Sequence, residues 1–367
     1  MKVLHLGKLC PPNEGGVDVF AFEIVEALKR KGIHADLLCL NSFTGEGIYR
    51  GIDYFSCKTN FFFNGAPISV DYALAFFKMK DSYDIIHVHC PVPMAEIVSL
   101  FTNQKVILHW HSDIVRQKLT YRFYRPIQRL LLKKAEKIIV TSKQYLDTSE
   151  QLRGYKHKAV VVPLGINPAR LSIDEEAQKE FGWISEKVQD KKVVLSLGRL
   201  VEYKGFEYLV KASKYLNDDI IVVIAGGGPL YSKLQTEIKK MGLDEKIILT
   251  GKVSNVAVFM KNCDVFCLPS VGRNEAFGLV LLEALYFGKP LITTNVVGSG
   301  MNYVNKNNQT GYIVPPKDPL ALAEAINKIL SDKELYSYFS ENAIQRFKEF
   351  EIDTIADKII EIYKEVL

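Results

Sequence analysis

The chain has 367 residues, of which 48% are hydrophobic and 24% are charged, and its formal net charge is +5. This composition is typical of a soluble globular protein, and the length exceeds what one hydrophobic core comfortably fills, so we expect two domains. No apolar stretch of the sequence approaches the roughly 20 residues of a membrane span, and the first residues do not resemble a signal peptide.

Patterns typical of strands and helices alternate along the chain, which predicts an α/β fold with parallel sheets. The expected strands of the first half are 2–7, 35–40, 84–90, 105–110, 137–141 and 159–163, with helices over 17–31 and 119–135. The expected strands of the second half are 192–197, 220–225, 247–250, 265–268, 291–294 and 311–314, with helices over 206–216, 228–241, 277–287, 319–331, 333–347 and 352–366. Two similar halves predict two Rossmann-like domains, with the linker inside 165–190.

Six cysteines are scattered mostly through apolar, strand-like runs. We therefore expect reduced core residues and not a disulfide framework. The spacing of Cys263 and Cys267 could suggest zinc, but no partner pair exists, so no zinc site is expected there. The six positions are Cys10, Cys39, Cys57, Cys90, Cys263 and Cys267.

Positive charge is concentrated in the first half of the chain. Residues 1–170 hold 23 Lys and Arg against 15 Asp and Glu, whereas residues 171–367 hold 24 against 27. Much of the excess runs from Arg116 to Lys137, where aromatic and leucine residues are interleaved with the basic ones. This pattern predicts binding to an anionic membrane surface, and an ordinary solvated helix face is the alternative. Nucleic acid is not expected, because no recognition motif accompanies the charge.

The most informative motif is a pair of glutamates, Glu275 and Glu283, separated by seven residues. The apolar run 265–268 predicts a buried strand before the motif, and Gly288 with Pro290 predict a helix end after it. If the span between the glutamates is helical, the carboxylates lie roughly 12 Å apart, at about 1.5 Å per residue. That separation suits two hydroxylated ends of one extended ligand, with an anion at the helix N-terminus.

This ligand description fits a sugar nucleotide, and the chain resembles the retaining glycosyltransferases of family 4 over nearly its whole length. The resemblance implies the GT-B fold, an α/β architecture in which two Rossmann-like domains have parallel sheets that face across a cleft. We expect residues 1–170 to form the acceptor-binding domain and residues 171–351 the nucleotide-sugar-binding domain. The last helix, 352–367, is expected to pack back on the first domain.

The resemblance also assigns roles to single residues. Arg199 and Lys204 would grip the donor diphosphate and stabilise the charge that develops on it; surface charges in a solvated loop are the alternative. Glu283 would accept hydrogen bonds from both ribose hydroxyls, and the alternative is a carboxylate paired within the core. Glu275 would contact hydroxyls of the transferred hexose. The other expected donor-binding residues are Gly15, Gly16, Ala276, Phe277, Gly278 and Leu279.

Four of the seven histidines form two pairs with i, i+2 spacing, His87 with His89 and His109 with His111. The members of a pair share one face of a strand, and open α/β sheets place ligands at the strand ends where these pairs lie. Such pairs can bind a metal, but no metal motif accompanies them, so we expect none. By resemblance His111 is the catalytic-region histidine, with Asp113 nearby.

The segments 111–118 and 273–278 are similar to bacterial α-mannosyltransferases that build O-antigen or related surface polysaccharides. The resemblance implies a retaining, metal-independent hexosyltransferase without a cofactor. It would move mannose from GDP-mannose to a lipid-linked oligosaccharide, on the cytoplasmic, inner face of the cell membrane. UDP-glucose and UDP-N-acetylglucosamine remain alternative donors, and a nucleotide-sugar epimerase or a degenerate binding subunit remains an alternative class. An oxidoreductase is disfavoured, because no dinucleotide glycine motif follows a strand.

Overall fold

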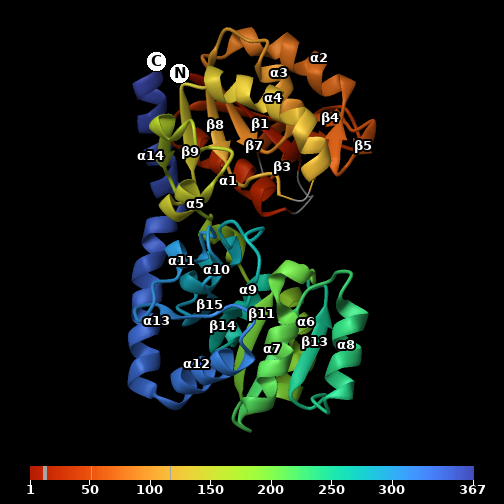
Figure 1. Cartoon of the computed structure of the whole chain (residues 1–367), viewed down its shortest axis with the longest axis vertical. Helices are drawn as coiled ribbons and strands as arrows, with labels where there is room; N and C mark the ends of the chain where they lie inside the picture. Colours follow the sequence, from red (N-terminus) through yellow and green to blue (C-terminus); the bar gives the residue numbers. More distant parts are fainter. Residues whose placement is uncertain (11–14, 51, 116) are drawn as a thin grey trace. The chain divides into compact units, whose positions relative to one another are not determined.

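The computed structural model describes residues 1–10, 15–50, 52–115 and 117–367, and these residues form two compact units. Unit 1 comprises Met1–Ile166 and Glu351–Leu367, and unit 2 comprises Asn167–Phe350 (Figure 1). Each unit has its own sheet and its own set of covering helices. In the described ranges, no helix combines the length and the apolar character needed to cross a membrane.

The sheet of unit 1 has the strand order β10-β9-β8-β7-β1-β2-β4-β3, and only the edge strand β3 is antiparallel to its neighbour. Its central strands are apolar runs buried on both faces, as a parallel sheet covered by helices requires. The strands are β1 (Lys2–Leu9), β2 (His34–Asn41), β3 (Gly45–Tyr49), β4 (Ile52–Lys58), β7 (Ile85–Cys90), β8 (Lys105–Trp110), β9 (Lys137–Val140) and β10 (Ala159–Val161). A separate hairpin joins β5 (Phe61–Phe63) to β6 (Ala66–Ile68).

The helices of unit 1 include the C-terminal segment of the chain. They are α1 (Gly16–Arg30), α2 (Val70–Met79), α3 (Pro93–Ser99), α4 (Lys118–Lys134), α5 (Lys143–Thr148) and α14 (Ile352–Val366). Helix α14 packs beside α1, and Arg30 forms an ion pair of 2.7 Å with Asp353. The buried residues Ile355, Ile359 and Tyr363 recur at every fourth position, so α14 packs one continuous apolar face against the rest of unit 1.

The sheet of unit 2 is wholly parallel, with the order β13-β12-β11-β14-β15-β16. Its strands are β11 (Lys192–Leu197), β12 (Ile220–Ala225), β13 (Ile247–Gly251), β14 (Val265–Leu268), β15 (Leu291–Thr294) and β16 (Gly311–Val314). This is the doubly wound order 3-2-1-4-5-6, and β4-β2-β1-β7-β8-β9 repeats it in unit 1. The prediction of two Rossmann-like domains is therefore confirmed. The order reverses between β11 and β14, where loops of such sheets bind ligands.

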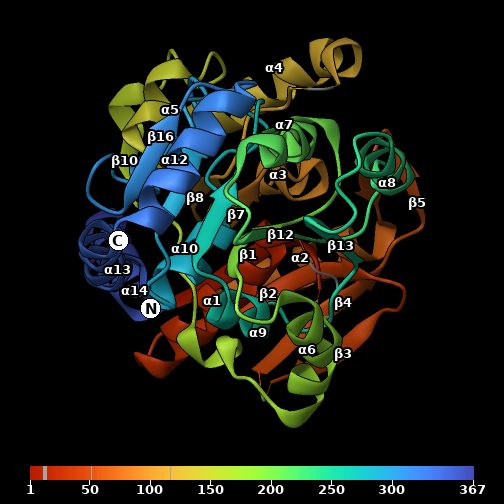
Figure 2. The same cartoon turned by 90° about the horizontal axis from the view of Figure 1, so that it is seen from below.

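Helices cover both faces of the second sheet. They are α6 (Glu175–Val188), α7 (Phe206–Ala212), α8 (Tyr231–Lys240), α9 (Val256–Asn262), α10 (Leu279–Tyr286), α11 (Met301–Val304), α12 (Pro319–Ser331) and α13 (Lys333–Phe347). Figure 2 shows α7 and α12 near one another, and Leu209, Leu234 and Ile326 join α7, α8 and α12 to the sheet in one core.

The prediction that all six cysteines are reduced is wrong. Cys10 and Cys39 form a disulfide, because β1 and β2 pair in parallel and bring the two Cα atoms within 5.2 Å. The sequence does not show which strands are neighbours. The boundary between the two units, after Ile166, lies inside the predicted linker 165–190. Much of the rest of that range is α6, in which Phe181 packs edge-on against Phe259. The N-cap of α6, Asp174, accepts a hydrogen bond from the Ala177 N–H and was a readable start signal.

Candidate active site

Lys204 and Glu275 come together from the two loops beside the switch point of unit 2. Lys204 ends the short turn after β11, and Glu275 follows β14. The Lys204 Nζ lies 2.5 Å from Oε2 of Glu275, and both residues are buried. Burial lowers the pKa of Lys204, but the negative charges of Glu275 and Glu283 outweigh it, so the pKa is raised. The site therefore holds a permanent buried cation.

Hydrogen bonds fix the loop that carries Glu275. The Ser270 hydroxyl donates to the Glu275 carboxylate, and the Ser299 hydroxyl donates to the Glu275 backbone carbonyl. The following helix, α10, begins at Leu279 and not at residue 277 as predicted. Gly278 precedes it with φ of +81°, a left-handed conformation that glycine adopts without steric cost. The span between the two glutamates is therefore not helical over residues 275–278, and the separation of roughly 12 Å expected for a helical span does not apply.

Glu283 lies inside α10, as predicted, and it forms an ion pair with Arg170. Burial raises the pKa of Glu283, while the charge and hydrogen bond of Arg170 act in the opposite direction. The alternative of a buried, paired carboxylate thus describes the ligand-free protein. A carboxylate has a second oxygen, so pairing with Arg170 leaves capacity to accept a further hydrogen bond. Sequence patterns gave no signal for Arg170, which lies in a short turn at the start of unit 2.

Arg199 has a different environment from Lys204. Its side chain is exposed, and no ion pair joins it to another residue in the ranges that the structure describes. The glycine-rich loop after β12 holds its backbone, since a Cβ added to Gly226 would lie 2.0 Å from the Gly198 carbonyl oxygen. The Leu200 N–H also donates to the Gly227 carbonyl. These contacts fix the path of the chain and leave the guanidinium available to an anion.

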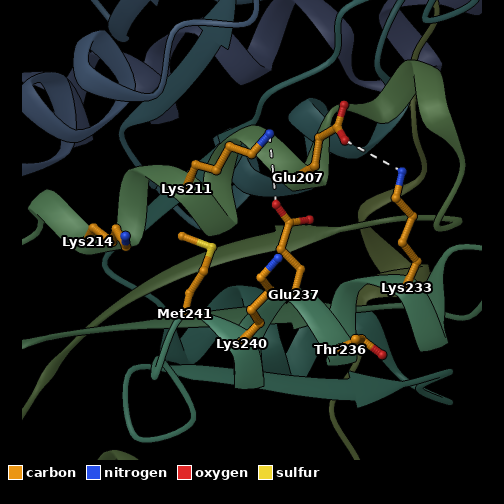
Figure 3. A pocket seen from close by; sticks show the side chains of 8 residues that line it. All are labelled: Glu207, Lys211, Lys214, Lys233, Thr236, Glu237, Lys240 and Met241. Atoms are coloured by element: carbon orange, nitrogen blue, oxygen red, sulfur yellow. Dashed lines mark ion pairs between the residues drawn. The ribbon is translucent and has the colours of Figure 1, made fainter.

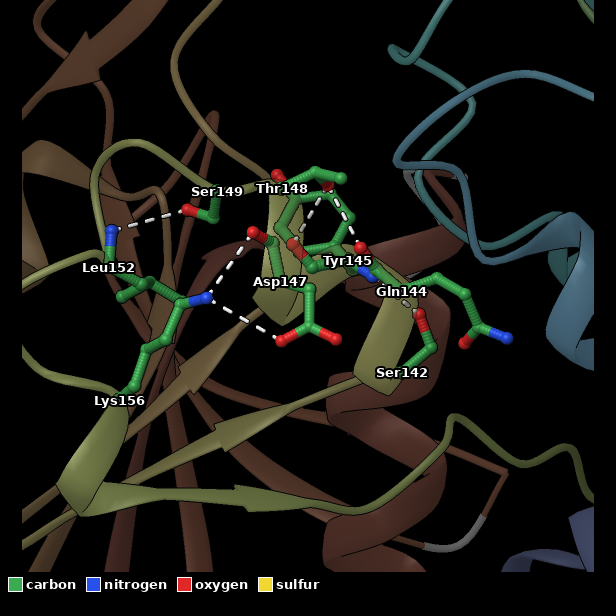
Figure 4. A network of polar contacts seen from close by, with 8 residues as sticks. All are labelled: Ser142, Gln144, Tyr145, Asp147, Thr148, Ser149, Leu152 and Lys156. Atoms are coloured by element: carbon green, nitrogen blue, oxygen red, sulfur yellow. Dashed lines mark hydrogen bonds and ion pairs between the residues drawn. The ribbon is translucent and has the colours of Figure 1, made fainter.

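In unit 1, polar contacts hold the loop that follows His111. The Asp113 carboxylate accepts hydrogen bonds from Trp110 Nε1 at 3.0 Å and from the Ser149 hydroxyl at 2.7 Å. The Asp113 N–H donates to the Tyr145 hydroxyl. Tyr145 and Ser149 belong to the network around α5 that Figure 4 shows, in which Ser142 caps the helix by accepting from the Tyr145 N–H. Asp113 therefore anchors the loop.

The glycine loop before α1 is only partly described, because residues 11–14 lie outside the described ranges. Gly15 caps α1, and its carbonyl accepts from the Val19 N–H. Asp18 in the first turn accepts from the Leu9 N–H, and burial raises the pKa of its carboxyl group to about 6. An anion bound at this loop would lie near the Asp18 carboxyl group. Asp18 is not among the predicted site residues, although an acidic residue in the first turn is a common helix feature.

The histidine pairs lie in the core of unit 1. His89, His109 and His111 form one group in which one nitrogen per ring lies within 4.8 Å of the others, and His5, His87 and His89 form a second. All five are buried. These two groups are the residues of the described chain that could hold a metal ion.

A surface pocket in unit 2 involves none of the predicted donor residues. Two ion pairs cross it, Lys211 with Glu237 at 3.8 Å and Lys233 with Glu207 at 4.0 Å (Figure 3). Its lining comes from α7, α8 and their flanking residues, and consists of Glu207, Lys211, Lys214, Lys233, Thr236, Glu237, Lys240 and Met241. The pocket is a solvated groove between two helices, and its charges are largely paired.

Comparison with known proteins identifies the family. Residues 14–170 match the model for Glycosyltransferase Family 4, and residues 177–346 match the model for Glycosyl transferases group 1. An O-antigen chain mannosyltransferase of Escherichia coli is 31% identical over 100% of this chain and 99% of its own length. The chain belongs to the family 4 glycosyltransferases. A D-rhamnosyltransferase of Pseudomonas aeruginosa is 28% identical to this glycosyltransferase over 95% of the chain and 92% of its own length.

Solved structures support the GT-B fold of the glycosyltransferase. Anabaena HepE in complex with UDP superposes with a TM-score of 0.81 at 18% identity, and both chains are covered completely. Sucrose-phosphate synthase from Thermosynechococcus elongatus superposes with a TM-score of 0.80 at 21% identity, over 100% of this chain and 99% of its own. These structures confirm the expected fold, and the family models and the Escherichia coli relative confirm that the enzyme is a glycosyltransferase.

Proposed function

We propose that the enzyme transfers mannose from GDP-mannose, with retention of configuration, to a lipid-linked oligosaccharide of a bacterial surface polysaccharide. The full-length similarity to an O-antigen mannosyltransferase is the observation that carries this proposal. The second relative transfers D-rhamnose, which is the 6-deoxy form of D-mannose. Both relatives therefore handle sugars with the same ring configuration.

The proposed roles follow from the charges of the site. Arg199 and Lys204 bind the diphosphate and stabilise its developing charge, so neither a metal nor a cofactor is invoked. Glu283 accepts from the ribose hydroxyls, while Glu275 and His111 contact the hexose. The Glu275 carboxylate is already engaged by Lys204, which makes it a poor covalent nucleophile. The acceptor hydroxyl then attacks on the face that the diphosphate leaves, and the departing phosphate takes its proton. This differs from the two-carboxylate chemistry of glycosidases.

Donor binding tests the proposal directly. Calorimetric titration with GDP, GDP-mannose, UDP and UDP-glucose is expected to show tighter binding of the GDP series. Arg199→Ala should weaken GDP binding about 10- to 100-fold, because a charge-assisted hydrogen bond contributes roughly 1.5–3 kcal/mol. Tight binding of the UDP series would overturn the donor and keep the enzyme class.

The matched control for Arg199 is Lys214→Ala, just after α7, which removes another exposed cation of unit 2. This variant should bind GDP like the wild type. Equal losses in both variants would show a general charge effect and refute a specific contact to the diphosphate.

We propose further that unit 1 binds the inner membrane face through α4 and the β5–β6 hairpin. Arg122, Arg125 and Arg129 are exposed on α4, and Phe123 beside them is 77% exposed. The hairpin adds three exposed phenylalanines, Phe61–Phe63, and the Asn64 side chain ties it to α4 by donating to the Thr120 hydroxyl. Exposed aromatic rings beside basic groups suit an anionic lipid surface. Arg116, at the predicted start of this region, lies outside the described residues.

Charge reversal tests the membrane surface. The triple variant R122E/R125E/R129E should release the protein from vesicles that contain anionic lipid, since each basic residue near such a surface contributes about 1 kcal/mol. Vesicle sedimentation measures the bound fraction. The control K233E/K239E/K240E makes the same charge change on exposed lysines of α8 and should stay bound. Undiminished binding of the α4 variant would identify those arginines as a solvated helix face.

A further inference from the structure

Five histidines and one tyrosine form a buried cluster in unit 1, and the proposed reaction uses only one of them. The members are His5 on β1, His87 and His89 on β7, His109 on β8, His111 directly after β8, and Tyr363 on α14. None is more than 2% exposed. Strand pairing sets His5 beside His87 and His89 beside His109, and alternate residues of a strand share one face.

Hydrogen-bond contacts link the six side chains in one line, in the order His111, His89, His5, Tyr363, His87 and His109. Nε2 of His111 lies 3.0 Å from Nδ1 of His89, and Nε2 of His89 lies 3.1 Å from Nδ1 of His5. The Tyr363 hydroxyl lies 3.1 Å from Nε2 of His5 and 2.7 Å from Nδ1 of His87. Nε2 of His87 lies 3.3 Å from Nδ1 of His109. Each ring therefore directs its Nδ1 toward the His111 end of the line and its Nε2 toward the His109 end.

The ring geometry favours hydrogen bonding over metal binding. The linked rings of His89 and His111 are inclined by only 7°, with centroids 5.2 Å apart, so their facing nitrogens point along the link at each other. A zinc ion needs three or four lone pairs aimed at one point in tetrahedral directions. The two arms of the line instead stack on each other, with His109 over His111 and His5 over His87 at 4.4 Å.

The rings are held neutral. Burial lowers the pKa of all five histidines, that of His89 to about 3, and most are lowered further by their neighbours in the cluster. Phe20 packs edge-on against His89, His109 and His111. Within the described ranges, no carboxylate forms an ion pair with any of the five rings. A neutral imidazole carries one N–H donor and one bare acceptor nitrogen.

One hydrogen per link then couples all the tautomers. If the Tyr363 hydroxyl donates to His5, every ring carries its hydrogen on Nδ1. If it donates to His87, every ring carries its hydrogen on Nε2. A mixture leaves a link with two hydrogens or with none, or it makes the Tyr363 oxygen accept from both His5 and His87 and leaves the hydroxyl hydrogen without an acceptor. In each case one hydrogen bond of a buried polar group is not made, which is costly.

We propose that the cluster is a tautomer relay, in which Tyr363 gives all five histidines one shared tautomer and thereby decides whether Nδ1 of His111 donates or accepts. The two ends, Nδ1 of His111 and Nε2 of His109, have no hydrogen-bond partner in the described part of the chain. One end is always a donor when the other is an acceptor. A sugar oxygen at His111 would select the tautomer of the whole line, and this last step alone rests on the proposed function.

Nitrogen-15 NMR of histidine-labelled protein tests the relay, because long-range proton–nitrogen spectra distinguish the two neutral tautomers from each other and from the charged ring. At pH 7 the five buried histidines of the wild type are expected to show one tautomer. Tyr363→Phe keeps the ring and removes the hydroxyl. It should separate the line into a three-ring and a two-ring arm, and the tautomer of at least one arm should change or become mixed.

Tyr72→Phe is the matched control. Tyr72 is also fully buried in unit 1, and its hydroxyl contacts the backbone carbonyls of Gly7 and Leu38, so the histidine signals should stay as in the wild type. Mixed tautomers among the five rings of the wild type would overturn the relay even if the Tyr363 variant failed to fold. Unchanged signals in a folded Tyr363→Phe protein would overturn it too, as would stoichiometric binding of added Zn²⁺ by the five rings.

Kinetics connect the relay to catalysis. A histidine in the wrong tautomer catalyses poorly, so Tyr363→Phe should lower kcat for sugar transfer at least about tenfold and leave the donor KM nearly unchanged. Uniform tautomers without mannose transfer would refute the proposed substrate and keep the relay. Mannose transfer with mixed tautomers would refute the relay and keep the substrate.

Discussion

Glu275→Gln is expected to lower the rate of sugar transfer by about 100-fold or more, which is the scale observed when one preorganised electrostatic group is removed from an active site. The change preserves the shape of the side chain and the hydrogen bond from Ser270. It removes the charge that orients Lys204 and weakens the proposed contact with the hexose. Glu202→Gln is the control, because Glu202 is exposed in the same loop region as Lys204. Steady-state kinetics with GDP-mannose measure both variants.

The Lys204→Met change completes a double-mutant cycle. Alone it leaves the buried Glu275 carboxylate without its cation, which should destabilise the fold by about 3–5 kcal/mol. In Lys204→Met/Glu275→Gln, no charge of the pair remains, so much of the lost stability should return while transfer stays abolished. Denaturant unfolding and kinetics report the two quantities separately. If activity returned together with stability, Lys204 and Glu275 would be a structural ion pair and not part of the catalytic site.

The central strands of both sheets were predictable because each is a short apolar run bounded by turn residues. The ranges 192–197 and 265–268 match β11 and β14 residue for residue. The missed elements carry weaker signals. The strands β3 and β4 end the sheet of unit 1, and β5 and β6 form a separate hairpin. All four are partly exposed, so they lack the buried apolar run of a central strand, and α2, α3 and α5 have no more than ten residues. Burial on both faces produces a sequence signal, whereas partial burial at a sheet edge does not.

At the candidate site, the positions of residues within loops and helices were predictable, but their contacts were not. The spacing of Glu275 and Glu283 indicated a loop residue and a helix residue, and both positions agree with the structure. The partners were not readable, since Arg170 and Glu283 lie 113 positions apart and Lys204 and Glu275 lie 71 apart. The same holds for Tyr363, which reaches His5 across 358 positions. Contacts between distant segments depend on strand order and packing, which no local pattern records.

The five buried histidines also predict steep acid unfolding. Their folded-state pKa values lie below the ordinary 6.5, so below pH 6.5 the unfolded chain binds more protons than the folded one. Stability is therefore fully present above pH 6.5 and is lost as the pH falls. Asp18, Glu96 and Glu283 act in the opposite direction, because burial raises the pKa of all three carboxyl groups. Five histidines outnumber these three groups, so the unfolded chain takes up more protons than the folded one below pH 6.5, and each net proton changes stability by about 1.4 kcal/mol per pH unit.

Denaturant unfolding between pH 7.5 and 5 measures this slope. His89→Gln should reduce the proton uptake by about one, because it removes one buried ring that titrates only in the unfolded chain. Replacing the exposed His157 by Gln is the control and should leave the slope as in the wild type. A flat profile down to pH 5 would mean that the buried rings accept protons in the folded state. A charged ring has two donors and no acceptor, so it could not belong to a line with one hydrogen per link. A flat profile would therefore also contradict the coupling of the five tautomers.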